Sequence, residues 1–329
     1  MRVLVIKTTS MGDVIHTLPA LTDATNAIPG IRFDWVVEEG FDEIPTWHPA
    51  VDQVFKVALR RWRKTWFSSL RGPEWKQFRQ QVKRAHYDCV IDAQGLLKSA
   101  WLTRYVKAPT FGFDRQSVRE PLASMAYQHK IKVPKAMHAV ERTRQLFAGA
   151  LNYKVPDSQG DYGLNKNHFI TSAPAIKNVV FLHGTTKHSK HWPDNYWQQL
   201  ATMVTAEGYK VYLPWGNSTE KDRAEKIAQS CHKTEVLPKL NIHGVASVLS
   251  RADGVVAVDT GLGHLTAALD VPAVSLYGPT SPDLVGAYGQ RQCHLSAKDQ
   301  PLVADIEPVE MAPLTPALVW QTLQPLLSS

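Results

Sequence analysis

The sequence predicts an α/β fold made of two doubly wound parallel sheets. Short apolar runs alternate with longer helical patterns along the 329 residues, and this alternation is typical of parallel sheets. The chain is longer than one hydrophobic core usually serves, so two domains are expected. A polar, turn-rich stretch at 152–174 separates two series of predicted strands. We therefore expect domains at 1–165 and 166–307, followed by a helical tail at 308–329.

The predicted elements follow one another in a regular order. The first series of strands comprises 3–6, 33–37, 52–57 and 89–92, and the second comprises 178–183, 209–214, 254–258 and 273–277. Helical patterns cover 12–28, 138–151, 193–207 and 219–229, and a last helix starts near Thr315 and Pro316, because proline is favoured in a first turn. Ligands of such sheets bind beyond the carboxyl ends of the strands, and a cleft between two such domains is a natural ligand site.

The composition is that of a globular protein, with 44% hydrophobic and 20% charged residues. The apolar runs are shorter than the ~20 residues of a membrane span, and the first run is too short for a signal peptide. The three cysteines are far apart in the sequence, which argues against a disulfide framework and against a zinc site. These features predict a cytoplasmic protein.

The net charge of +7 is concentrated in one segment. Ten lysines and arginines and a single acid, Glu74, lie between Lys56 and Arg84, so the local balance is 10 − 1 = +9. Three tryptophans are interleaved with them: Trp62, Trp66 and Trp75. Such a segment attracts nucleic acid, a lipid headgroup surface or an acidic substrate, although dense charge is also common on a merely solvated face.

Familiar cofactor motifs are missing from the sequence. It contains no GxxxxGK[ST], no GxGxxG after the first strand, no HExxH and no CxxC. A Walker-type ATPase is therefore excluded, and a dinucleotide-dependent oxidoreductase is disfavoured. The paired aspartates of a D-x-D motif are also missing, so the sequence calls for no metal and no cofactor.

Two loops of the second half favour a phosphate ligand. Asp259 ends a strand, and the turn that follows leads through Thr260 and Gly261 into a helix that contains His264. Helix N-terminal amides favour an anion, and Asp259 would accept hydrogen bonds from sugar hydroxyls, although an ordinary glycine turn is an equal alternative. The loop after the strand at 178–183 offers two threonines and two lysines, which also suit phosphate: Thr185, Thr186, Lys187 and Lys190. Together these loops indicate a nucleotide diphosphate.

Two acids allow more than one interpretation. Glu220 opens a helix, where it would either bind ribose hydroxyls or simply favour the first turn. Asp13 lies at the start of the helix after the first strand and would stabilise that helix in the same way. If the second domain holds a sugar nucleotide, however, Asp13 would act as general base on an acceptor hydroxyl, with His16 one turn further on.

Seven motifs together resemble the lipopolysaccharide heptosyltransferases, and among them the type I enzymes: KTTSMGDVIHTLPAL, RRWRK, DAQGLLKSA, REPLAS, HAVERTR, TTKHSKHWP and VDTGLGHLTAALDVPAVSLYGPT. The resemblance covers nearly the whole chain and keeps the motif order. It implies an inverting GT-B glycosyltransferase, with two Rossmann-like domains facing each other across a cleft. It also implies transfer of L-glycero-D-manno-heptose from ADP-heptose to the Kdo sugar of Kdo2-lipid A. This would be the first heptose of the inner core, added at the cytoplasmic face of the inner membrane by a peripheral protein.

The resemblance also implies roles for residues that match its motifs. Asp13 is the general base, and Lys190 stabilises the departing diphosphate. The donor-binding positions are Thr185, Thr186, Lys190, Glu220, Leu240, Asp259, Thr260, Gly261 and His264. At Leu240 the family pattern has methionine, so the sequence departs from it there. The acceptor-binding positions are Arg60, Arg61, Arg63, Lys64, Arg119 and Arg142.

The predicted acceptor gives the basic segment a purpose. Kdo carries a carboxylate and lipid A carries phosphates, and arginine binds both groups well. The interleaved tryptophans would then rest at the membrane interface. Three alternatives are a transferase for the second heptose or another ADP-sugar, a nucleic-acid-binding protein that uses the basic segment, and a binding protein without turnover. The nucleic-acid alternative leaves the two phosphate loops without a purpose, so we expect no nucleic acid partner.

Overall fold

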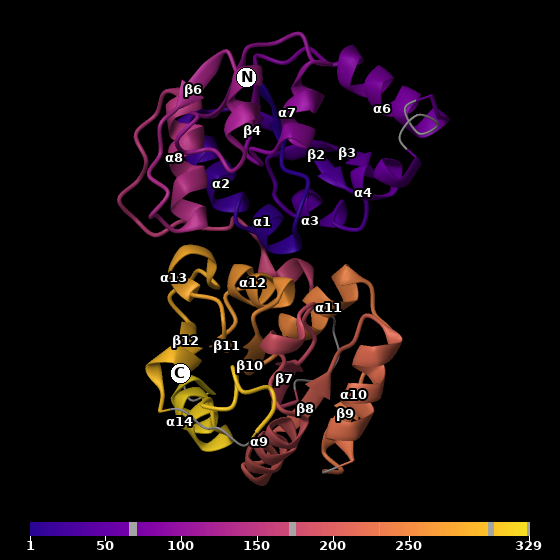
Figure 1. The fold of residues 1–329 in the computed structure, drawn as a ribbon, viewed down its shortest axis with the longest axis vertical. Helices are drawn as coiled ribbons and strands as arrows, with labels where there is room; N and C mark the ends of the chain where they lie inside the picture. Colours follow the sequence, from indigo (N-terminus) through magenta and orange to yellow (C-terminus); the bar gives the residue numbers. More distant parts are fainter. Residues whose placement is uncertain (66–70, 171–175, 230, 302–305, 328–329) are drawn as a thin grey trace. The chain divides into compact units, whose positions relative to one another are not determined.

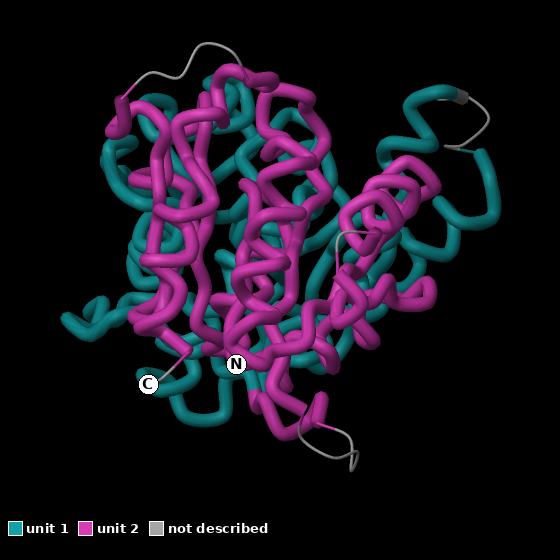
Figure 2. The backbone as a smooth tube through the Cα atoms, turned by 90° about the horizontal axis from the view of Figure 1, so that it is seen from below, with its two compact units in different colours: residues 1–164 teal, residues 165–329 magenta. Residues whose placement is uncertain are grey.

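The computed structural model describes residues 1–65, 71–170, 176–229, 231–301 and 306–327. The chain forms two compact units, Met1–Leu164 and Asn165–Ser329, which Figure 2 shows in different colours. The end of the predicted 152–174 linker and the last two residues of the predicted tail lie outside the described residues.

Unit 1 contains a six-stranded parallel sheet (Figure 1) with the order β3-β2-β1-β4-β5-β6. Its strands are β1 (Arg2–Ile6), β2 (Arg32–Glu38), β3 (Val51–Val57), β4 (Cys89–Asp92), β5 (Thr110–Phe113) and β6 (His129–Ile131). The connecting helices are α1 (Met11–Ile15), α2 (Leu18–Ala27), α3 (Glu43–Thr46), α4 (Leu59–Trp62), η1 (Arg63–Thr65), α6 (Pro73–Arg84), α7 (Leu97–Thr103), η2 (Pro121–Ala126) and α8 (Ala139–Leu151).

Unit 2 repeats this plan with the sheet order β12-β11-β10-β7-β8-β9, again parallel. Its strands are β7 (Asn178–Leu182), β8 (Lys210–Leu213), β9 (Thr234–Val236), β10 (Gly254–Val258), β11 (Ala273–Tyr277) and β12 (Gln292–Ser296). Its helices are η3 (Lys166–His168), η4 (His188–Lys190), α9 (Asp194–Ala206), α10 (Ser218–Ala228), α11 (Ile242–Leu249), α12 (Gly261–Ala268), α13 (Pro282–Val285), η5 (Ala297–Asp299) and α14 (Pro316–Leu327).

The predicted fold class is confirmed, since both sheets have the strand order of a doubly wound Rossmann-like domain. In each sheet, the chain reverses its direction of winding between the first and fourth strands of the unit. These switch points lie between β1 and β4 and between β7 and β10. Loops that leave these strands are therefore the favoured places for ligands.

One predicted helix is wrong in extent. The pattern at 12–28 forms two helices, α1 and α2, and the second begins at Leu18 with Pro19 in its first turn. Proline lacks an N–H, so Pro19 cannot donate to the carbonyl four residues earlier, and the series of helical hydrogen bonds is interrupted there. Four short strands, β5, β6, β9 and β12, were not predicted.

The last helix, α14, belongs to the core of unit 2. The side chains of Val319 and Leu323 on this helix are fully buried among residues of the sheet and of α9. The Trp192 indole N–H donates a hydrogen bond to the Leu314 carbonyl at 2.7 Å, just before α14 begins. The helix also lies close to Gly254 at the start of β10, where a Cβ atom would meet Leu327.

Candidate active site

Asp13 lies in the first turn of α1, in the loop that leaves β1. Its Oδ2 accepts hydrogen bonds from the Ser10 backbone N–H at 2.7 Å and from the Ser10 hydroxyl at 3.0 Å. Asp13 therefore caps the helix, as one of the two interpretations of the sequence required. The side chain is still 32% exposed, and its Oδ1 lies 3.7 Å from Lys7 Nζ. The cap thus uses Oδ2, while Oδ1 lies beside the Lys7 ammonium group.

Nearby positive charge keeps the Asp13 carboxylate ionised. Burial alone raises the pKa of Asp13, but the Lys7 charge, the Ser10 hydrogen bonds and the Arg119 charge together lower it below its ordinary value. Lys7 is itself buried, and burial lowers the pKa of its ammonium group. A carboxylate with a lowered pKa carries no proton at neutral pH, so Asp13 is in the state that a general base needs.

The loop after β4 holds the loop after β1 in place. The Gln94 side-chain carbonyl accepts hydrogen bonds from the Thr8 and Thr9 N–H groups, both at 2.9 Å, and Lys7 Nζ donates to the Ala93 carbonyl at 2.9 Å. Asp92, fully buried, accepts from the Tyr127 hydroxyl at 2.7 Å and from Ser99 at 2.9 Å. Its pKa is raised by burial, although these hydrogen bonds oppose the rise.

These supporting residues were not predicted as part of a site. The signal was present in the DAQGLLKSA motif, because polar residues directly after a buried strand seldom serve the core. Asp92 and Gln94 fix the geometry of the loop that carries Asp13, so we regard them as positioning residues.

Two of the predicted acceptor-binding arginines change the pKa of residues in the loop after β1. The positive charges of Arg119 and Arg142 both lower the pKa of Lys7. Arg119 is exposed, whereas Arg142 is half-buried and donates a hydrogen bond to the Ser117 carbonyl while its guanidinium lies over the Phe113 ring. The structure therefore brings Lys7, Asp13, Arg119 and Arg142 into one electrostatic cluster.

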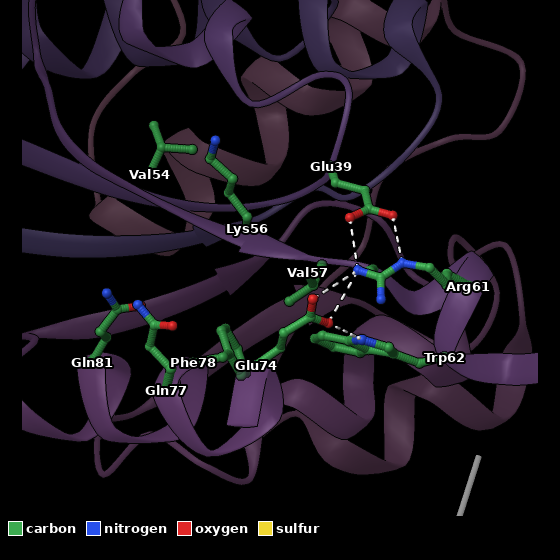
Figure 3. Close-up of a pocket in the computed structure, with 11 residues that line it drawn as sticks. Glu39, Val54, Lys56, Val57, Arg61, Trp62, Glu74, Gln77, Phe78 and Gln81 are labelled. Atoms are coloured by element: carbon green, nitrogen blue, oxygen red, sulfur yellow. Dashed lines mark hydrogen bonds and ion pairs between the residues drawn. The ribbon is translucent and has the colours of Figure 1, made fainter. Parts of the chain in front are cut away.

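The basic segment provides the other four predicted acceptor-binding residues. Arg60, Arg63 and Lys64 are exposed on α4 and η1. Arg61 is bound by two carboxylates, donating to both oxygens of Glu39 and of Glu74 at 3.0–3.2 Å, as Figure 3 shows. Arg61 and its two carboxylate partners line part of a pocket of about 310 Å³.

The predicted membrane role of the tryptophans is wrong for the two that the structure describes. Trp62 and Trp75 are only 4% and 2% exposed, and their rings pack edge to face in the core of unit 1. The Trp62 indole N–H also donates to Glu74 at 2.9 Å (Figure 3). Trp66 lies outside the described residues. The rings of Trp62 and Trp75 therefore belong to the core of unit 1.

Unit 2 contains a compact polar cluster around Asp259, at the carboxyl end of β10. Its Oδ2 lies 2.5 Å from Lys190 Nζ and accepts a hydrogen bond from the Thr280 hydroxyl at 2.8 Å. The Thr185 hydroxyl donates to the Asp259 carbonyl at 3.0 Å. Loops after β7, β10 and β11 thus converge at one point. Thr280, which follows β11, was not predicted, although its position after a buried strand was a usable signal.

The N-terminus of α12 lies beside this cluster. Thr260 is its N-cap residue, with extended backbone and no side-chain capping bond, and Gly261 is the first helical residue. The first N–H groups of a helix have no partner within it, and the helix dipole adds positive potential there. His264 follows within the first turn and is 8% exposed. The arrangement suits an anion held between α12 and Lys190.

The remaining predicted donor-binding residues lie on neighbouring loops. Glu220, in the first turn of α10, accepts a hydrogen bond from the Gly216 N–H at 2.7 Å and lies against Gly184, where a Cβ atom would meet its carboxyl carbon. Leu240 lies half-buried just before α11, against Gly244. Thr186 is exposed in the loop after β7. Glu220 thus joins the loops after β7 and β8.

Each unit therefore has polar side chains at its own switch point. In unit 1 the loops after β1 and β4 bear Asp13 and its supports, and in unit 2 the loops after β7 and β10 bear Lys190 and Asp259. Among the described residues, no group of three or more His, Cys, Asp or Glu side chains could hold a metal ion. Each unit thus has its own polar cluster at the place where doubly wound sheets bind ligands.

Comparison with known proteins decides the family. A model of glycosyltransferase family 9 (heptosyltransferase) matches residues 75–310. The chain belongs to glycosyltransferase family 9. Lipopolysaccharide heptosyltransferase 1 of Pseudomonas aeruginosa is 59% identical to it over 298 residues, which cover 90% of this chain and 84% of that protein. The Escherichia coli protein of the same name is 53% identical over 92% of this chain and 96% of its own length.

Solved structures of family 9 proteins have the same fold as this chain. The structure of E. coli heptosyltransferase WaaC with ADP has a TM-score of 0.91 at 52% identity and covers 98% of both chains. The same protein with ADP-2-deoxy-2-fluoro heptose has a TM-score of 0.88 at 50% identity, again over 98% of each chain. E. coli heptosyltransferase II, at 19% identity, shares the fold with a TM-score of 0.78 over 100% of this chain and 99% of its own. The predicted enzyme class, a GT-B glycosyltransferase, is confirmed.

Proposed function

We propose that this enzyme transfers L-glycero-D-manno-heptose from ADP-heptose to the Kdo sugar of Kdo2-lipid A, the first heptose of the lipopolysaccharide inner core. The observation that carries the proposal is the likeness to a heptosyltransferase whose structure contains an ADP-heptose analogue, at 50% identity over 98% of the chain. Relatives named heptosyltransferase 1 align over 90% of this chain. A relative named heptosyltransferase 2, from Haemophilus influenzae, aligns over only 29%, which supports the first heptose over the second.

In this proposal unit 2 binds the donor. The diphosphate would lie at the N-terminus of α12, within reach of Thr260, Gly261 and His264, and Lys190 would provide the compensating charge. Asp259 and Thr185 hold the Lys190 loop and the α12 turn together. Glu220 and Leu240 would contact the nucleoside end, and Thr186 would bind phosphate. The donor domain is proposed at 166–307, with 308–329 as its helical tail.

Unit 1 would bind the acceptor, within a domain proposed at 1–165. The carboxylate of Kdo and the phosphates of lipid A would pair with cations of the basic segment and of the Asp13 cluster. The residues proposed for this are Arg60, Arg61, Arg63, Lys64, Arg119 and Arg142. Among the described residues no helix has the length and hydropathy of a membrane span, and we propose that the enzyme works as a peripheral protein on the cytoplasmic side of the inner membrane.

The proposed chemistry is a single inverting displacement. Asp13 accepts the proton of the Kdo hydroxyl as its oxygen forms a bond to the anomeric carbon of the heptose. The bond from that carbon to the β-phosphate oxygen breaks at the same time, and ADP takes the electron pair. Lys190 and the α12 N-terminus stabilise the charge that develops on the diphosphate. The proposal is supported by the lowered pKa of Asp13 and by the proximity of Lys190 to the end of β10.

The test is ADP release from ADP-heptose by the purified protein. De-acylated Kdo2-lipid A should accelerate the release and yield a product heavier by one heptose. Release only with an acceptor that already carries one heptose would replace the proposal with the second-heptose activity. Absence of release with either acceptor would contradict both.

A further inference from the structure

An apolar groove on unit 1 has no role in the proposed chemistry. It lies between α7 and η2 and has a volume of about 610 Å³. Three large apolar side chains at this groove are unusually exposed: Leu97 at 50%, Leu122 at 59% and Met125 at 78%. Single exposed apolar residues are ordinary, but three around one groove mark an interaction surface.

The polar groups of the groove are already satisfied within the protein. The Thr110 N–H donates to the Gln128 side-chain carbonyl at 3.2 Å, and the Gln128 backbone N–H donates to the Thr110 hydroxyl at 3.0 Å. The Thr103 hydroxyl donates to the Ala100 carbonyl at 2.7 Å. The groove therefore offers apolar contact and few free hydrogen-bonding groups. This is a poor match for a sugar and a good one for hydrocarbon.

Cations outnumber acids around the groove. Arg104 is the single charged residue in its lining, and it is exposed. Lys107, also exposed, lies between the lining residues Val106 and Ala108. One carboxylate lies nearby, because Glu120, just before η2, accepts a hydrogen bond from the N–H of the lining residue Leu97 at 2.6 Å. Hydrocarbon edged mainly by cations complements an anionic lipid leaflet.

We propose that this groove is the surface by which the enzyme docks on an anionic lipid bilayer, with Leu122 and Met125 inserted among the acyl chains. The proposal rests on the proposed function, because a lipid acceptor has to be met at a bilayer. It places the membrane contact at α7 and η2, away from Trp62 and Trp75, which are buried. Helix α7 also bears Lys98, whose Nζ lies 3.4 Å from the Thr9 hydroxyl in the Asp13 loop, so the docking surface and the proposed base share one supporting element.

The test compares vesicle binding with turnover in solution, using the full chain. Vesicles of phosphatidylethanolamine and phosphatidylglycerol in equal parts are sedimented with the parent and with a Leu122→Asn, Met125→Asn double variant. Binding of the variant should fall about tenfold or more, since two large apolar side chains no longer insert. ADP release with the de-acylated, water-soluble acceptor should stay within twofold of the parent. Arg104→Glu should weaken binding to these vesicles more than to phosphatidylcholine vesicles.

The matched control is Ile176→Asn, which removes an apolar side chain that is 52% exposed on unit 2. It should leave vesicle binding unchanged. The proposal is overturned if the double variant binds as the parent does, if the control loses binding equally, or if a parent dimer dissociates in the variant. Loss of turnover on the soluble acceptor would place the groove in acceptor binding instead. Failure of the parent to release ADP with any acceptor would contradict the proposed function, while the vesicle result would still decide the docking surface.

Discussion

Asp13 combines two tasks at the residue scale, since it bonds the N-cap residue Ser10 of α1 and its side chain is still 32% exposed. Replacing it by Asn retains an oxygen that can accept the Ser10 N–H bond but removes the proton acceptor. We therefore expect turnover to fall by about 10²–10⁴-fold, with binding of ADP-heptose nearly unchanged. Steady-state kinetics together with donor titration separate the two effects. A variant with near-normal turnover would reduce Asp13 to a capping residue.

Lys7 should set the pH range over which Asp13 acts. The Lys7 charge contributes to the lowered pKa of Asp13, so the carboxylate stays ionised down to acidic pH. A Lys7→Met variant removes that charge and should raise the pKa of Asp13. The acidic limb of the kcat/KM profile would then move to higher pH, because protonation of the base begins earlier. A limb that stays in place, in a variant that melts normally, would show that another group governs it.

Lys190 and Lys187 offer a matched pair, because both lie in the same short loop and only Lys190 is paired with Asp259. Lys190→Ala should lower turnover by about 10²–10³-fold, the usual cost of losing one group that stabilises developing negative charge. Lys187 is exposed, and Lys187→Ala should change turnover little. Equal losses in both variants would mean that the loop attracts the donor by general charge alone.

At the residue scale, the sequence indicated the side chains at the ends of buried strands and little about their partners. Asp13, Lys190 and Asp259 follow the apolar runs that predict β1, β7 and β10. Gln94 and Thr280 contribute hydrogen bonds whose existence depends on loops that meet only in the folded chain. Burial of Trp62 and Trp75 depends on tertiary packing in the same way.

At the element scale, the central strands were predictable, whereas three of the four edge strands, β6, β9 and β12, were missed. Strands β1, β4, β7 and β10 are buried on both faces and form continuous apolar runs. The missed strands β6 and β9 have three residues each and include exposed polar side chains. Pairing with a neighbouring strand stabilises them, and such pairing leaves no periodic pattern in the sequence.

His48 links α2 to the turn before β3 and should make unit 1 sensitive to acid. Its Nδ1 accepts from the Ala50 N–H at 3.2 Å and its Nε2 lies 3.1 Å from the Thr22 hydroxyl. Burial lowers the pKa of His48 from 6.5 to about 4. Between these values the unfolded chain binds a proton that the folded chain does not. The free energy of unfolding should therefore be fully retained above pH 6.5 and fall by roughly 3 kcal/mol as the pH decreases to about 4.

Urea unfolding at several pH values, monitored through a signal that comes from unit 1, measures how the free energy of unfolding depends on pH. His48→Gln keeps one donor and one acceptor but cannot titrate in this range. Its free energy of unfolding should vary less with pH than that of the parent between 6.5 and 4. An identical pH dependence in both proteins would assign the acid sensitivity to other groups.

Helix α14 should be essential to unit 2. Leu323 is fully buried and contacts the core that also contains α9 and β10. Leu323→Ala should lower the free energy of unfolding by about 2–5 kcal/mol, as large-to-small core substitutions do. Trp320, partly buried on the same helix, provides a control, since Trp320→Phe retains most of the apolar volume. If Leu323→Ala had no effect on stability, α14 would be a dispensable tail.

At the scale of the whole molecule, two units of one topology hold different chemistry at equivalent places. Unit 1 presents a carboxylate with a lowered pKa, after its first strand. Unit 2 presents Lys190 after its first strand and the N-terminus of α12 after its fourth strand. Strand order therefore predicts where the ligand site of each unit lies, whereas the residues in its loops determine its chemistry, which we propose to be proton removal in unit 1 and phosphate binding in unit 2.

This division predicts a local response to nucleotide. ADP at about 100 times its Kd should stabilise the unit that binds it by about 2.7 kcal/mol, because a ligand that binds only the folded state shifts unfolding by mass action. In hydrogen exchange of the full chain, ADP should protect amides at 184–191 and 259–264, and it should leave amides at 93–97 in unit 1 unchanged. Asp259→Ala, which removes the carboxylate that holds Lys190, should weaken this protection. Protection confined to unit 1 would reverse the assignment of donor and acceptor units, because ADP carries the phosphates that the N-terminus of α12 is proposed to hold.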